Sequence, residues 1–276
     1  QVFVVALGSL GGEARQRIAR EAATHSDMLL LAQVDSYEAL ASKVALALQV
    51  ITALDISYDY LLKTDDDTFV RADRLLAQLA FVALPNVYWG FFNYGTERHA
   101  ESSPGEGSNA HSLGAKWADS RYNDTYYPPY AQGCGYALSR SLVQQIAARA
   151  DPANPPSRLE DAATGIYLED VRDVNRVEVW WNDVPAVKSG SSHEQCSDDL
   201  VLRCHTPSTD AMARWTRNLA SCGCMCSCDP PSCNLTVPWS PVLSTELTYS
   251  PKQIAWIYRR KQLELERRLG ARRAFL

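Results

Sequence analysis

The chain has 276 residues, of which 46% are hydrophobic, so it is long enough to bury the core of one large domain. Its net charge of -5 and the lack of a dense basic run in the body of the chain argue against nucleic acid as a partner. No apolar run reaches the ~18 residues that a transmembrane helix requires.

Short apolar runs and amphipathic segments alternate along the chain. The apolar runs predict strands at residues 2–7, 28–31, 58–63, 87–92, 177–181 and 200–203. Apolar side chains at three- and four-residue steps predict helices at residues 13–24, 37–54, 71–82, 141–149 and 208–219. Asp35 and Glu38 form a capping box before the second helix. Gly133 and Gly135 are predicted to form tight turns, and residues 93–120 a surface loop that covers a site.

This alternation predicts an α/β fold in a single domain, with a Rossmann-like, mostly parallel sheet and helices on both faces. In such sheets, ligands bind beyond the carboxyl ends of the strands. We expect residues 1–221 to form this domain, followed by a Cys-rich segment at 222–236 and a C-terminal extension at 237–276. Pro251 is suited to the first position of a helix in that extension.

Seven of the eight cysteines lie between Cys196 and Cys233, and Cys134 stands apart. Sequons at Asn123 and Asn234 could accept N-linked glycans in a secretory lumen. Together these features favour an oxidising compartment and disulfide bonds. The cysteine cluster could instead bind zinc, but its spacing is not a pair of CxxC motifs. The connectivity of the disulfides stays open.

Three consecutive aspartates, Asp65, Asp66 and Asp67, follow the predicted strand at 58–63. Adjacent carboxylates repel one another and resist burial, so this position favours a site for a hard divalent cation. A solvated acidic turn is the alternative. His205 directly follows the strand at 200–203, where it could bind a metal or simply form a hydrogen bond.

Six motifs occur in one order along the chain. They are Asp35-Ser36-Tyr37 with Lys43, KTDDDTFV at 63–70, YWGFF at 88–92, YPPYxxGxGYxLS at 127–139, Glu160-Asp161 with Gly165, and Cys196 followed by His205. Together they give the chain a resemblance to glycosyltransferase family 31, the inverting β-1,3-galactosyl- and N-acetylglucosaminyltransferases of the secretory pathway. The YWGFF run and residues 196–219 are most similar to the β-1,3-galactosyltransferase 6 type, which adds galactose to the proteoglycan linkage region.

The resemblance implies a GT-A-like fold and a UDP-sugar donor, most readily UDP-galactose, with Mn²⁺ or Mg²⁺ as the metal. The cation would neutralise the pyrophosphate charge as the bond to the anomeric carbon breaks, and one imidazole ligand favours Mn²⁺. The metal ligands implied by the resemblance are Asp67, Asp65 and His205. The donor contacts that it implies are Asp65, Asp66, Lys63, Tyr37 and Lys43.

Inversion in one displacement requires a base on the face opposite the leaving UDP. By resemblance Asp161 is that base and Glu160 supports the site, and a helix start there would favour the ionised carboxylate. The alternative interpretation is that Glu160 and Asp161 form an acidic helix start with no catalytic role. Trp89, Gly135 and Tyr136 are expected to contact a glycan acceptor, although a Trp in a strand more often belongs to the core.

Two alternative functions stay open, a non-catalytic sugar- or nucleotide-binding relative and a β-1,3-N-acetylglucosaminyltransferase. The sequence begins at Gln1 and not at Met, which predicts a fragment or a processed form. The family's first strand and an arginine-and-tryptophan segment would precede Val2. The resemblance also implies a Golgi lumenal domain of a type II membrane protein whose anchor lies outside this sequence.

Overall fold

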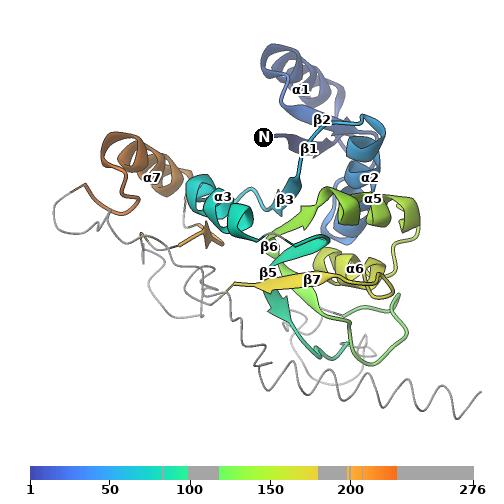
Figure 1. The fold of residues 1–276 in the computed structure, drawn as a ribbon. Coiled ribbons are helices and arrows are strands. Elements are labelled where there is room, and N and C mark those ends of the chain that lie inside the picture. Colours follow the sequence, from blue (N-terminus) through green and yellow to red (C-terminus); the bar gives the residue numbers. More distant parts are fainter. Residues whose placement is uncertain (83, 99–117, 180–197, 199, 207, 229–276) are drawn as a thin grey trace, which may run out of the picture.

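The computed structural model describes residues 1–82, 84–98, 118–179, 198, 200–206 and 208–228 (Figure 1). Most of the loop expected at 93–120 lies outside these residues. Residues 229–236 of the Cys-rich segment and the helix expected from residue 251 also lie outside the described residues. The division into residues 1–221, 222–236 and 237–276 therefore stays a prediction. Among the described helices, none combines the length and the apolar character needed to cross a bilayer.

Every predicted strand and helix that falls within the described residues is present, with ends that move by a few residues. The helices are α1 (Gly12–His25), η1 (Tyr37–Ala39), α2 (Leu40–Ala53), α3 (Ala72–Phe81), α5 (Arg140–Arg149), α6 (Glu160–Tyr167) and α7 (Thr209–Cys222). The strands are β1 (Phe3–Ala6), β2 (Met28–Leu31), β3 (Tyr60–Thr64), β4 (Phe69–Val70), β5 (Val87–Asn93), β6 (Tyr130–Ser139), β7 (Asn175–Glu178) and β8 (Leu202–Arg203). The single helix expected at 37–54 begins as the separate turn η1, and Ser36 caps this turn by accepting from Ala39 N at 3.2 Å.

The central sheet is mixed, so the expectation of a mostly parallel sheet is confirmed only in part. Its order is β3-β6-β5-β7, with β6 antiparallel to both β3 and β5, and with β5 and β7 parallel. The error lies in β6, because Gly133 and Gly135 belong to this strand and do not form tight turns. Gly135 allows close packing at this point, since a Cβ there would lie 2.5 Å from Leu202 Cδ1. β1–β2 and β4–β8 form two further small sheets.

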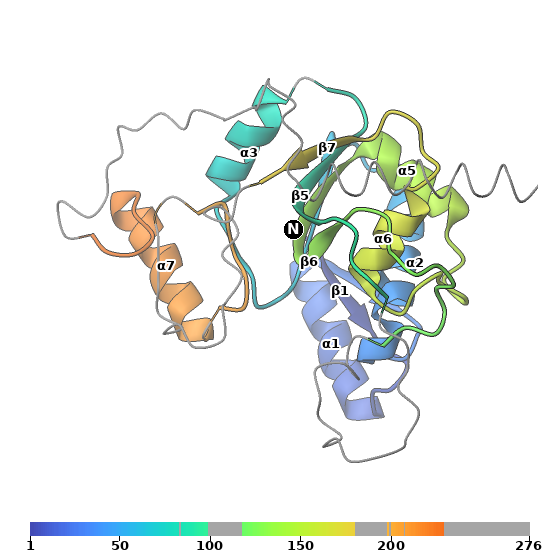
Figure 2. The same cartoon turned by 90° about the horizontal axis from the view of Figure 1, so that it is seen from below.

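Helices cover both faces of the central sheet, as predicted. On one face, α2 and α5 pack with Tyr88, Tyr136 and Leu138 in one buried cluster, and α6 lies on the same side. On the other face, Leu75 and Leu79 of α3 pack against Trp89 and its neighbours. Figures 1 and 2 show α3 and α7 on one side of the sheet, with α2, α5 and α6 on the opposite side.

The described cysteines form disulfides, as the cysteine content predicts. Cys134 of β6 is bonded to Cys204, which follows β8, across a sequence separation of 70 residues. Cys222 and Cys228 close a short loop after α7. No cysteine among the described residues is free, so the structure favours disulfides over the zinc alternative there.

Helix α6 lies unusually close to the start of β6 because of Gly165. A methyl group at this position would sit 2.7 Å from Tyr130 Cβ and 3.0 Å from the Pro129 carbonyl oxygen. We therefore expect Gly165→Ala to destabilise the protein by about 1–3 kcal/mol, the usual cost of overpacking, although alanine is the better helix former. Thermal and denaturant unfolding measure the change.

Gly12→Ala is the matched control for this substitution. Gly12 is the first residue of α1, and a methyl group there meets no atom within 4 Å. The control should keep or slightly raise the unfolding midpoint. Equal midpoints for the two variants would contradict the close packing of α6 on β6.

Candidate active site

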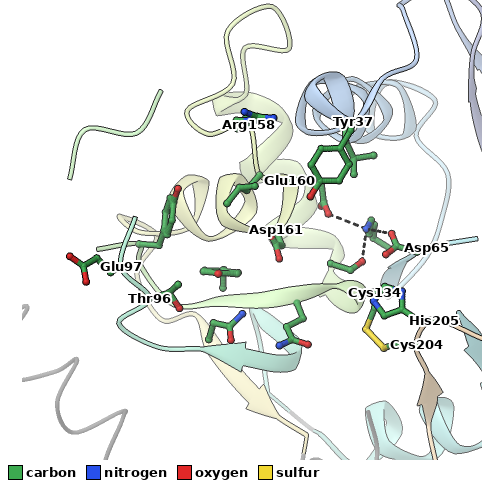
Figure 3. Close-up of a pocket in the computed structure, with 18 residues that line it drawn as sticks. Tyr37, Asp65, Thr96, Glu97, Cys134, Arg158, Glu160, Asp161, Cys204 and His205 are labelled. Carbon is green, nitrogen blue, oxygen red and sulfur yellow. Dashed lines mark hydrogen bonds and ion pairs between the residues drawn. A yellow bond between two sulfur atoms is a disulfide. The ribbon is translucent and has the colours of Figure 1, made fainter. Parts of the chain in front are cut away.

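A pocket of about 490 Å³ opens where β3, the first half of β6, the start of α6 and the segment after β8 meet. Figure 3 shows Asp161 in the middle of this pocket, with Asp65 and His205 toward one end and Thr96 and Glu97 toward the other. The pocket brings together six of the residues predicted from the sequence. These are Tyr37, Lys63, Asp65, Glu160, Asp161 and His205.

Lys63 joins three segments of the chain through its ammonium group. Its Nζ lies 2.7 Å from Asp65 Oδ1 and 3.0 Å from Glu160 Oε2, and it also donates to the Gly133 carbonyl oxygen. Burial opposes the charge on Lys63, but the carboxylates of Glu160 and Asp65 raise its pKa above the usual value. The lysine is therefore a permanent cation between the aspartate run and the start of α6.

Glu160 is a buried carboxylate with two partners. Besides Lys63, it accepts a hydrogen bond from the hydroxyl of Tyr136, which also lies 3.1 Å from Thr164 Oγ1. Burial, followed by the charge of Glu160, raises the pKa of Tyr136 well above its usual value, so the phenol keeps its proton and donates. A buried carboxylate is tolerated when it is paired and hydrogen-bonded in this way.

Asp161 faces the pocket but is otherwise enclosed by protein. Its Oδ1 accepts from Ala162 N at 2.9 Å, as expected for a carboxylate in the first turn of a helix. Burial, followed by the charge of Glu160, raises the pKa of Asp161 to about 7, whereas the backbone N–H groups and the Lys63 ammonium act in the opposite direction. A carboxyl group with this pKa can accept a proton near neutral pH.

Asp67 lies beside His205, which lines one end of the pocket. The pairing of β4 with β8 sets this position, and Thr206 N donates to the Asp67 carbonyl oxygen at 2.7 Å. His205 Nδ1 lies 3.1 Å from Asp67 Oδ2. The other oxygen, Asp67 Oδ1, is buried and has no hydrogen-bond partner among the described residues. An acceptor without a donor is suited to a cation.

The pair therefore fits a divalent cation, although not as the three-residue set that was predicted. The Asp67 carboxylate and the His205 imidazole would supply one oxygen and one nitrogen ligand from side chains 3.1 Å apart. The third predicted ligand, Asp65, instead pairs with Lys63. Within the described part of the chain, no three His, Cys, Asp or Glu side chains gather as a metal site. Further ligands would have to come from substrate phosphates or water.

Besides Asp67, which adjoins the pocket through its contact with His205, five predicted site residues do not line the pocket. Asp66 is exposed to solvent outside it, and Lys43 Nζ pairs with Asp35 at 3.2 Å. Trp89 is fully buried and donates from Nε1 to Gln78 Oε1, so its predicted stacking on an acceptor is wrong. The remaining two, Gly135 and Tyr136, are also buried in the sheet, where they pack against Leu202 and hold Glu160.

Sequence reasoning missed several residues of the pocket wall. Tyr130 lies within the motif at 127–139, but its neighbours Asn93 and Thr96 belong to no motif. Asp119 is buried without lining the pocket, and it accepts hydrogen bonds from Tyr127 at 2.8 Å and from Ser157 at 2.6 Å. The side chain of Asp119 thereby fixes the segment that leads into α6. Glu97, Gln132 and Arg158 are further polar residues of the wall that were missed.

Comparison with known proteins assigns the chain to a family. Residues 1–179 match the family described as Galactosyltransferase. β-1,3-Galactosyltransferase 6 of Mus musculus is 34% identical over 181 residues, which cover 63% of this chain and 50% of that protein. UDP-GalNAc:β-1,3-N-acetylgalactosaminyltransferase 2 of Xenopus tropicalis is 25% identical over 213 residues, which cover 76% and 38%. The chain thus spans half or less of the length of these relatives. Because the family match covers well over half of its residues, the chain belongs to the galactosyltransferase family.

Proposed function

We propose that the chain is the catalytic part of an inverting, metal-dependent β-1,3-glycosyltransferase that moves galactose from UDP-galactose to a hydroxyl of a glycan. The observation that carries this proposal is the position of Asp161. It is a carboxyl group poised near neutral pH in the middle of a pocket, in a chain of the galactosyltransferase family. This position in the pocket supports a catalytic role for Asp161 over the alternative, an acidic helix start with no catalytic role.

In the proposed reaction, Asp161 takes the proton from the acceptor hydroxyl while the hydroxyl oxygen bonds to the anomeric carbon of the sugar. The bond from that carbon to the UDP oxygen breaks in the same step, so the configuration inverts. Glu160 pairs with Lys63 and thereby keeps the first turn of α6 in place. A pKa near 7 means that a large fraction of Asp161 carries the charge a base needs at neutral pH.

The donor would occupy the end of the pocket near Asp65 and His205, and the acceptor the end near Thr96 (Figure 3). Asp67 and His205 would hold the divalent cation, which when bound neutralises the charge that develops on the pyrophosphate. Asp65 would lie closest to the ribose and uracil, and Tyr37, on the pocket wall, would contact the nucleoside. A Golgi lumenal location with a membrane anchor elsewhere in the protein belongs to the same proposal.

The donor can be tested by UDP release with UDP-galactose, UDP-GalNAc, UDP-N-acetylglucosamine and UDP-glucose. UDP-GalNAc is included because a relative is named for it. β-Galactosides and β-xylosides serve as acceptors, each with and without Mn²⁺. Fastest turnover with UDP-galactose is the expected result. UDP binding without turnover on any pair would instead indicate the non-catalytic relative.

Asp161→Asn should abolish most of the turnover, because the amide cannot accept the acceptor proton. Loss of a general base typically lowers the rate ~10²–10⁴-fold. In the unsubstituted protein, kcat/KM should rise with pH through about 7 as Asp161 ionises. Asp170→Asn is the matched control, because Asp170 is exposed and lies outside the pocket. Turnover that survives Asp161→Asn would remove Asp161 from the base role.

The same substitution should stabilise the fold at alkaline pH. The folded-state pKa of Asp161, about 7, lies above the unfolded value of ~3.9, so the fold favours the protonated form. The contribution of Asp161 to the free energy of unfolding is fully present below pH ~4 and is lost as the pH rises through about 7. At ~1.4 kcal/mol for each pKa unit, Asp161→Asn should gain on the order of 4 kcal/mol at most at pH 8. Urea unfolding at pH 5 and pH 8 tests this, and an equal effect at both would contradict it.

Asp67→Ala and His205→Ala should each weaken metal-dependent binding of UDP by at least ~10-fold, because each removes one of the two protein ligands. Calorimetric titration of UDP with Mn²⁺, and again with a chelator, measures the effect. Asp170→Asn should leave the affinity unchanged. UDP affinity that responds neither to the chelator nor to Asp67→Ala would exclude this metal site.

A further inference from the structure

The ammonium group of Lys63 is already surrounded by protein partners. A lysine ammonium donates three hydrogen bonds and accepts none. Asp65 Oδ1 at 2.7 Å, Glu160 Oε2 at 3.0 Å and the Gly133 carbonyl oxygen supply three acceptors. The Lys63 side chain is only 12% exposed, although it borders the pocket. A donor phosphate could reach this cation only by displacing one of these partners.

We propose that Lys63 is a positioning residue that fixes the Glu160 carboxylate beside Asp161, and that it is not a ligand of the sugar donor. The proposal corrects the donor-binding role that the resemblance implies for Lys63. It rests on the proposed role of Asp161 as the base. Its physical content is that one buried cation pairs with Glu160 and thereby holds the first turn of α6 in place.

Burial makes Glu160 dependent on this cation. The Glu160 side chain is 3% exposed, and its only charged partner among the described residues is Lys63. The Tyr136 hydroxyl supplies one hydrogen bond but no charge. Without Lys63, a buried carboxylate must either take up a proton or move toward solvent. Either change disturbs the neighbouring residue, Asp161.

Other ionisable groups around Asp161 do not replace Lys63. Arg158 lines the pocket, but its guanidinium pairs with Glu38 at 3.6 Å. Lys63 is therefore the cation that contacts the carboxylates beside the base, at the carboxyl end of β3. The ionisable groups around Asp161 are Tyr37 of η1, Lys63 and Asp65 at the end of β3, Tyr88 of β5, Tyr130 of β6, and Arg158 and Glu160 around the start of α6.

A charge-balanced cycle tests the proposal in four proteins. These are the unsubstituted chain, Lys63→Met, Glu160→Gln and the double variant Lys63→Met/Glu160→Gln. The first readout is the pH at which kcat/KM reaches half of its plateau. Lys63→Met should raise this pH by ~1 unit or more, because the Lys63 charge that lowers the pKa of Asp161 is lost. The double variant should bring it back toward the original value, since both charges are gone.

The second and third readouts do not depend on turnover. The thermal midpoint lost in Lys63→Met should be recovered by at least half in the double variant, because no unpaired buried charge remains there. UDP affinity in the presence of Mn²⁺ should change less than ~3-fold in Lys63→Met, well below the loss expected when a donor ligand is removed. If Lys63→Met alone fails to fold, the double variant and Glu160→Gln still report the coupling.

Three results would overturn the proposal. One is an additive loss of thermal midpoint, with the double variant as unstable as the two single losses combined. Another is a loss of UDP affinity of ~10-fold or more in Lys63→Met with an unshifted pH profile, which would make Lys63 a donor ligand. The third is a pH profile that moves in Lys63→Met and is not restored in the double variant. Failure of the proposed function looks different, because all four proteins would lack turnover while the midpoints still form the cycle.

Discussion

Strand β6 is the element on which the site depends, because it is hydrogen-bonded along both edges and covered on both faces. Its register with β3 places Lys63 opposite Tyr136, and the Tyr136 hydroxyl reaches Glu160 on α6. Gly133 and Cys134 of the same strand border the pocket. Because strand side chains alternate between the faces of a sheet, a slip of one residue would turn Tyr136 toward α3 and leave Glu160 without its hydroxyl partner. The pocket chemistry is thus fixed by backbone pairing.

The distribution of charge in the pocket separates residues that look alike in the sequence. One buried ammonium, that of Lys63, serves both Asp65 and Glu160, and it does not bond to Asp161. Burial and the neighbouring Glu160 charge then leave Asp161 with a pKa near 7. Because the folded protein favours the protonated form of Asp161, the fold is less stable at neutral pH, where this group ionises. Such a cost is typical where a group is kept ready for proton transfer.

The sequence predicts the parts of this structure that depend on local pattern. Helical periodicity gives the helices, and the position of Asp65 to Asp67 after a strand indicates the edge where the pocket lies. It does not predict β6, since this strand is buried on both faces, carries two glycines and therefore shows no alternation. The sequence also does not show whether Trp89 belongs to the core or to the site, because cores and sugar-binding surfaces both contain aromatic side chains. The contact of Lys63 with Glu160 joins segments far apart in the chain, and no local signal records it.

The two ends of the pocket are held by different means, and Lys63 connects them. At one end, the Cys134–Cys204 disulfide and the β4–β8 pairing keep His205 beside Asp67. Toward the base, the close contact that Gly165 allows between α6 and β6 fixes the first turn of the helix. In the proposed reaction, UDP leaves at the first end while Asp161 takes up a proton in the middle. Because Lys63 contacts both the aspartate run and the helix start, a shift at one end reaches the other through a single ammonium group.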